Sequence, residues 1–182
     1  AVQRPYQQIP FQYSLHIQNS KNSDVLHNEF LAESEKAEPR INFINSLIRD
    51  CGINGSILVY NLGFEKSILN QLVKDFPEYE SQLQGIIDRL VDLMVPFQKK
   101  HYYTPEMKGS YSIKSILPAL CPELSYQDLE IKEGGTASRV FGQMLSGEFK
   151  GDVQLTRTHL LKYCKLDTLS MVKLLDKIHQ VI

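Results

Sequence analysis

Two acidic residues interrupt the apolar stripes of two segments that lie far apart in the sequence. Asp167 lies three residues after Cys164 and four before Met171, in a stretch whose apolar residues recur at the spacing of a helix. Glu65 lies three residues before Ile68 and falls in the first turn of another predicted helix. A carboxylate turned toward a core loses hydration and needs a partner. The two acids are therefore candidates for one shared site.

Carboxylates of this kind are the ligands that Mg²⁺ and Mn²⁺ prefer in proteins. Two such ions, about 3.5–4 Å apart, align a water molecule and stabilise an in-line phosphoryl displacement. Tyr163 precedes Asp167 by one helical turn, so its hydroxyl would orient that water or contact the phosphate. We therefore expect Tyr163, Glu65 and Asp167 to be catalytic, with Glu65 and Asp167 as metal ligands.

Each of these residues also has a structural interpretation. Glu65 can serve its helix alone, because a first-turn carboxylate is favoured by the helix dipole. Asp167 can be an N-cap if the helix breaks at Leu166 and restarts at Thr168. Tyr163 can be a packing residue whose hydroxyl finds a partner. The sequence leaves these alternatives open, and the metal hypothesis gains weight because the three signals coincide.

The elements that must position these residues predict an α/β layer fold. The alternating stretch 8–18 predicts a strand, and 25–32 predicts the second arm of a hairpin. The apolar run 56–60 is typical of a strand buried on both faces, and Glu65 follows its end, where ligands bind in open α/β sheets. Residues 91–97 predict another strand. Helices are expected between Pro39 and Gly52 and over 63–76, 79–90, 112–120, 135–145 and the last segment of the chain.

The segment 99–114 is basic and rich in tyrosine, with Glu106 as its single acid. Lysines neutralise phosphates and aromatic rings stack on bases, so the segment predicts binding of single-stranded DNA or RNA. The alternative is a solvated loop with some packed tyrosines. The candidate strand-binding residues are Lys99, Lys100, Tyr102, Tyr103, Lys108, Tyr111 and Lys114.

The bulk properties restrict the class of protein. The 182 residues are about the length of one domain, and we expect residues 1–182 to form one. The net charge is −1, so a nucleic-acid partner must be met by a local patch. Three widely spaced cysteines favour a reducing, cytoplasmic compartment. We see neither a membrane-spanning run nor a signal peptide, and so expect no membrane partner. The chain does not open with Met, and we expect further polypeptide upstream.

Several stretches resemble a known superfamily. Tyr163 followed by Asp167 resembles the third motif of the tyrosine subclass of DEDD-type 3′–5′ exonucleases, since Lys162 stands where the histidine subclass has His. VYNLGFEKSIL resembles their second motif, and GSYSIKSILPAL the segment between the motifs. More closely, RPYQQIPFQYSLHI, MKGSYSIKSILPAL and YCKLDTLSMVKLL are similar to an uncharacterised bacterial domain family placed in that superfamily, over nearly the whole chain.

This resemblance implies a ribonuclease H-like mixed sheet flanked by helices, and a metal-dependent nuclease in the intact protein. Asp92 is ambiguous, since the exonuclease segment that it resembles often carries an Asp with a structural role, whereas Asp88 is expected on a solvated face. The chain departs from the pattern at two points. Glu65 stands where the exonucleases usually have Asp, and the first motif, an Asp-x-Glu on the first strand, is missing before Phe11.

We therefore expect the first strand to be absent from this chain, leaving a slot between 8–18 and 56–60 and a two-metal site that is incomplete. The isolated chain should be a poor nuclease. The competing hypothesis is a catalytically inactive nucleic-acid-binding or scaffolding domain of a larger protein, which the Glu65 departure favours.

Overall fold

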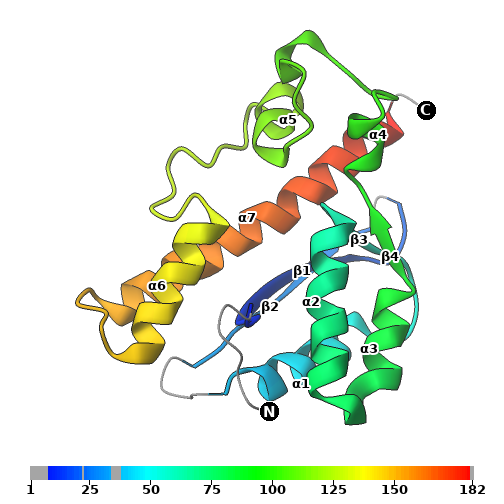
Figure 1. Ribbon diagram of the computed structural model, residues 1–182. Helices are drawn as coiled ribbons and strands as arrows, with labels where there is room; N and C mark the ends of the chain where they lie inside the picture. The colour runs from blue at the N-terminus through cyan, green and yellow to red at the C-terminus, as the bar shows by residue number, and fades with distance from the viewer. Residues whose placement is uncertain (1–7, 22, 34–37, 181–182) are drawn as a thin grey trace.

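The computed structural model describes residues 8–21, 23–33 and 38–180. The chain forms a mixed α/β fold (Figure 1), as predicted. In chain order the elements are β1 (Gln12–Gln18), β2 (Val25–Leu31), α1 (Arg40–Cys51), β3 (Ile57–Val59), α2 (Leu62–Asp75), the 3-10 helix η1 (Pro77–Tyr79), α3 (Glu80–Ile87), β4 (Leu90–Asp92), α4 (Val95–Gln98), the 3-10 helix η2 (Pro105–Met107), α5 (Ile113–Leu120), α6 (Gly134–Ser146) and α7 (Val153–His179).

β1 and β2 form the predicted hairpin. They pair antiparallel from Gln12 opposite Leu31 to Gln18 opposite Val25. One further bond, from the Ala32 amide to a carbonyl at 2.8 Å, extends the pairing past the end of β2. The first strand begins at Gln12 rather than at residue 8, so the prediction was right in kind and too long at its start.

β3 and β4 form a parallel pair joined through α2, η1 and α3, with Ile57 opposite Leu90. Two expectations need correction here. β3 is half-buried rather than buried on both faces, because within the described residues it has β4 as its strand neighbour. The predicted strand 91–97 ends at Asp92, and the chain enters α4 with Pro96 in its first turn, where the missing N–H costs no ladder bond.

The two strand pairs are separate sheets. In the part of the chain that the structure describes, no hydrogen-bonded ladder joins β1–β2 to β3–β4. The slot expected between 8–18 and 56–60 stays a prediction. Whether residues 1–7 contribute a strand lies outside the described residues, and the finer ribonuclease H-like assignment stays a prediction.

Helix α7 runs diagonally across the molecule, with α6 along its first half and α5 and α4 near its last turns (Figure 1). Asp152 caps it by accepting a bond of 2.9 Å from the Leu155 amide. Arg157 ties it to the hairpin by donating to two carbonyl oxygens at the end of β2. The helix continues unbroken through Asp167, so the alternative in which that residue caps a restarted helix is wrong.

Three apolar clusters hold these elements in place. The first packs α1, α2 and α3 together and includes Ile44 and Leu72, while the second joins α6 to α7 around Leu160. The third packs α4, η2 and α5 against the end of α7 at Leu174. Phe30 on β2 contacts both the first and the second cluster. The helices that carry Glu65 and Asp167 are therefore fixed against the same hairpin. No helix among the described residues has the length and apolar character needed to cross a membrane.

Candidate functional site

The turn between β3 and α2 presents Glu65. Asn61 adopts a left-handed conformation with φ 80°, which Asn tolerates better than most residues. The Asp92 carboxylate accepts the amides of Asn61, Leu62 and Met94 at 3.2, 3.0 and 2.9 Å. Asp92 thereby ties the end of β4 to the start of α2, which favours the structural interpretation of this residue. Glu65 follows in the first turn of the helix, whose N-cap residue Asn61 makes no side-chain cap bond.

Asp167 lies on helix α7. The residue that follows it, Thr168, fixes how the helix is turned about its axis relative to the hairpin. The Thr168 hydroxyl lies 2.7 Å from the Ser14 hydroxyl and 2.8 Å from Nδ1 of His16, both on β1. Ser14 is buried and also contacts Nε2 of His27 at 2.9 Å. This polar group pins one face of α7 to the hairpin. The charge of the neighbouring Asp167 acts on Glu65 in α2.

Glu65 and Asp167 are linked by electrostatics, and the convergence of their carboxylates at one site stays a prediction. Burial raises the pKa of Glu65, and the negative charge of Asp167 raises it further. Burial also raises the pKa of Asp167 and outweighs the opposing effects of nearby hydroxyls and of a lysine. A half-buried carboxyl that feels a second negative charge gains from a proton or a nearby cation.

Two tyrosines lie beside Asp167. Tyr163, one turn earlier on α7, is buried, and its hydroxyl helps to hold down the pKa of Asp167. Tyr126 donates a hydrogen bond of 2.7 Å to Oδ1 of Asp167, and its ring centre lies 6.4 Å from that of Tyr163. The pKa of each tyrosine is raised, first by burial and then by the charge of Asp167. Both hydroxyls therefore stay protonated and act as donors.

Tyr126 carries no functional signal in the sequence. The residue lies in the connection between α5 and α6, residues 121–133, which contains no helix or strand. Its contact with Asp167 joins two segments with no shared motif, and no periodic pattern singles out one tyrosine in an irregular stretch. The importance of Tyr126 is visible in the folded structure, through its contact with Asp167.

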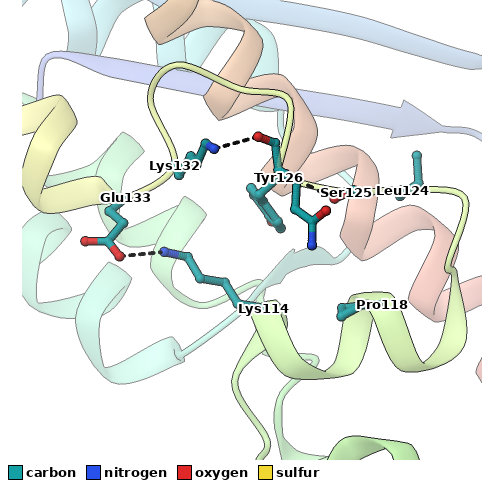
Figure 2. A pocket seen from close by; sticks show the side chains of 8 residues that line it. Lys114, Pro118, Leu124, Ser125, Tyr126, Lys132 and Glu133 are labelled. Atoms are coloured by element: carbon teal, nitrogen blue, oxygen red, sulfur yellow. Dashed lines mark hydrogen bonds and ion pairs between the residues drawn. The ribbon is translucent and has the colours of Figure 1, made fainter.

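Lys114 on α5 brings a positive charge to this group. That charge lowers the pKa of Asp167, and the ammonium group lies 3.9 Å from Glu133. A cavity of about 220 Å³ opens between α5 and the connection, lined by Lys114, Tyr126, Lys132 and Glu133 among others. Figure 2 shows Lys114 reaching across it toward Glu133. This cavity borders the candidate site at Tyr126 and Lys114.

The rest of the segment 99–114 is divided. Tyr102 is half-buried and packs edge-on against Phe97 at 6.1 Å between ring centres, which favours the packing alternative for this ring. The segment is tied to the end of β3 by a bond of 2.6 Å from the Tyr60 hydroxyl to the Tyr111 carbonyl. The remaining candidates are exposed: Lys99, Lys100, Tyr103, Lys108, Tyr111 and Lys114. Of these six residues, Lys114 forms an ion pair with Glu133. The role of all six in binding stays a prediction.

The role of Glu65 and Asp167 as ligands of a divalent cation stays a prediction. Glu65 and Asp167 supply oxygen ligands in a half-buried setting where a positive charge would lower the cost of ionising both. Over the described ranges, no three Asp, Glu, His or Cys side chains gather in a group that could hold a metal. Cys164 adds no ligand, because burial and the neighbouring acids raise the pKa of its thiol to about 12.

The structure is a mixed α/β domain in which half-buried Asp167 accepts a hydrogen bond from Tyr126 and acts electrostatically on half-buried Glu65. The family model for a domain of unknown function, DUF2779, matches residues 1–112, and the chain belongs to that family. It is also similar to an uncharacterised protein, UU173, of Ureaplasma parvum serovar 3, with 30% identity over 142 residues. The match covers 66% of this chain and 20% of that relative. No solved structure matches the chain.

Proposed function

We propose that this chain is the ribonuclease H-like domain of a metal-dependent nuclease that hydrolyses phosphodiester bonds in single-stranded DNA or RNA, in the manner of 3′–5′ exonucleases. The observation that carries the proposal is the pairing of Glu65 with Asp167, which lie close enough for one charge to raise the pKa of the other. The pair lies past the carboxyl end of β3, where α/β sheets bind ligands. The resemblance of Tyr163 and Asp167 to the third exonuclease motif gives further support.

The roles follow from the contacts. Glu65 and Asp167 would hold Mg²⁺ or Mn²⁺, which when bound supplies positive charge that stabilises phosphoryl displacement. Tyr163, whose raised pKa keeps its hydroxyl protonated, would orient the attacking water or donate to the phosphate. Lys114 would neutralise a phosphate of the strand, since its charge already acts on Asp167. The exposed lysines and tyrosines of 99–114 would hold the rest of the strand.

Activity is proposed for the intact protein. The chain spans a fifth of the curated relative that it matches, and the described residues offer two ligands where a two-ion site needs more. An acidic strand from the upstream polypeptide, paired in the slot between β1 and β3, would complete the set. The isolated chain should hold at most one ion, with water filling the remaining positions.

A nuclease assay tests this proposal. Single-stranded DNA and RNA are incubated with Mn²⁺ or Mg²⁺ and either this chain or a form extended upstream, and we expect hydrolysis from the extended form. Asp167→Asn should abolish it, because the change removes charge with little change in volume. Tyr163→Phe should lower it less, because it removes a hydroxyl. Asp176→Asn, on the same helix α7, is the matched control. Full activity in Asp167→Asn would refute the site assignment.

A second candidate is a nucleic-acid-binding or scaffolding domain without catalysis. Glu65 in place of Asp favours it, as does the lack of a three-ligand group within the described part of the chain. The same assay separates the two. An extended protein that binds single strands but hydrolyses none of them would establish the binding module.

A further inference from the structure

Tyr126 contacts Asp167, which lies in a distant part of the sequence. Hydrogen bonds and apolar packing hold Tyr126 in place. Its hydroxyl donates to Oδ1 of Asp167 at 2.7 Å. Its backbone carbonyl accepts a bond of 3.2 Å from the Leu129 amide, although the connection has no helix or strand. The side chains of Tyr126 and Leu129 both pack against the second apolar cluster, which joins α6 to α7. The phenol is thus held in position by its own surroundings.

That hydrogen bond fixes a torsion that is otherwise soft. The last torsion of an aspartate side chain is broad and roughly two-fold, so the carboxylate plane of Asp167 has no strong preference of its own. A donor at a set position selects one orientation, and a bond to a carboxylate is stronger than one between neutral groups. The Tyr163 hydroxyl also acts on this carboxyl, but in the proposed mechanism it turns to the water or the phosphate, which leaves Tyr126 as the lasting donor.

We propose that Tyr126 is a positioning residue of the cation site: its hydrogen bond sets the rotation of the Asp167 carboxylate so that a ligand oxygen is presented toward Glu65 before a divalent cation arrives. The inference rests on the proposed function, because it supposes that these two acids hold the cation. Outer residues that bond to a ligating carboxylate change metal affinity by about 10- to 100-fold. The role makes the connection between α5 and α6 part of the site.

Mn²⁺ alone is the probe for the test, titrated calorimetrically into the intact protein. Asp167→Asn identifies the binding that belongs to this site. Tyr126→Phe keeps the ring and removes the hydroxyl, and it should raise the Kd for Mn²⁺ about 10- to 100-fold. Tyr13→Phe is the matched control, since it removes a hydroxyl that donates to the Asp50 carboxylate at 2.5 Å in the first cluster. The control should leave the Kd unchanged.

Thermal unfolding separates positioning from folding. A purely structural role would lower Tm equally in EDTA and in Mn²⁺, whereas a positioning role lowers the rise in Tm that Mn²⁺ causes. If Tyr126→Phe binds Mn²⁺ as wild type does while Asp167→Asn does not, the inference is overturned and the proposed function stands. If wild type shows no Mn²⁺ binding that depends on Asp167, both are overturned.

Discussion

Replacing Asp92 tests how the turn before α2 presents Glu65. Oδ1 of Asp92 accepts the amides of Asn61 and Met94, and Oδ2 accepts the amide of Leu62. Asparagine has a single acceptor oxygen, so Asp92→Asn can keep the two bonds at Oδ1 but places an NH₂ group against the Leu62 amide. Alanine at this position removes all three acceptors.

The expected cost follows from these three bonds. A hydrogen bond to a charged group contributes about 1.5–3 kcal/mol, and a buried donor left without an acceptor costs about 1–3 kcal/mol. The Leu62 residue is half-buried, so water replaces part of what is lost. We therefore expect Asp92→Asn to lower the free energy of unfolding by about 2 kcal/mol, and Asp92→Ala by about 4 kcal/mol.

Urea denaturation of the 182-residue chain measures both changes. Asp88→Asn is the matched control, because Asp88 is exposed and accepts a side-chain bond from Gln84 within α3 and its cap. Its effect should stay within about 0.5 kcal/mol. In the intact protein, Asp92→Asn should also weaken Mn²⁺ binding, since the turn carries Glu65. If Asp92→Asn proves as stable as Asp88→Asn with an unchanged denaturant slope, the structural role of Asp92 is refuted.

Three further predictions concern the strand, the hairpin and the core. In the intact protein, changing the exposed Lys99, Lys100 and Lys108 together to Gln should weaken single-strand binding. The change should also reduce the slope of log K against log salt by about 2. The matched control, in which the exposed Lys21, Lys74 and Lys150 are changed to Gln, should alter neither the affinity nor the slope. The pKa of His16 is lowered to about 4, first by burial and then by His27. Between its ordinary value near 6.5 and that pKa, the unfolded chain binds the proton more readily, so urea titrations should show stability falling as pH falls, and His16→Gln should reduce the fall. Arg40→Ala should lower the free energy of unfolding by about 3–5 kcal/mol in the same assay, because the buried guanidinium pairs with Asp75 at 2.7 Å.

Local signals in the sequence predicted most elements. Pro39 and Gly52 bracket α1, and the alternation of 12–18 with 25–31 gives the hairpin. The burial of β3 was wrong because an apolar run reports the character of a strand and not how many neighbours it has. The end of β4 was missed because Pro96 was read within a strand instead of opening a helix.

The candidate site likewise contains residues that the sequence could predict and residues that it could not. Glu65 and Asp167 were predictable because an acid on an apolar stripe conflicts with its surroundings, and the conflict is visible in each segment separately. Tyr126 was not, because its interest lies in a contact between an irregular connection and a distant helix. Lys114 was expected to bind the strand, but its closeness to Asp167 depends on how α5 packs, which no local pattern reports.

The most direct test of the account is anomalous diffraction from crystals of the intact protein grown with Mn²⁺. We predict a peak between the carboxylates of Glu65 and Asp167, with at least one oxygen of each about 2 Å from the ion. The Tyr126 hydroxyl should still donate to Asp167 in that structure. Carboxylates that face apart, or a peak that lies elsewhere with none between them, would contradict the claim that these two residues form one cation site.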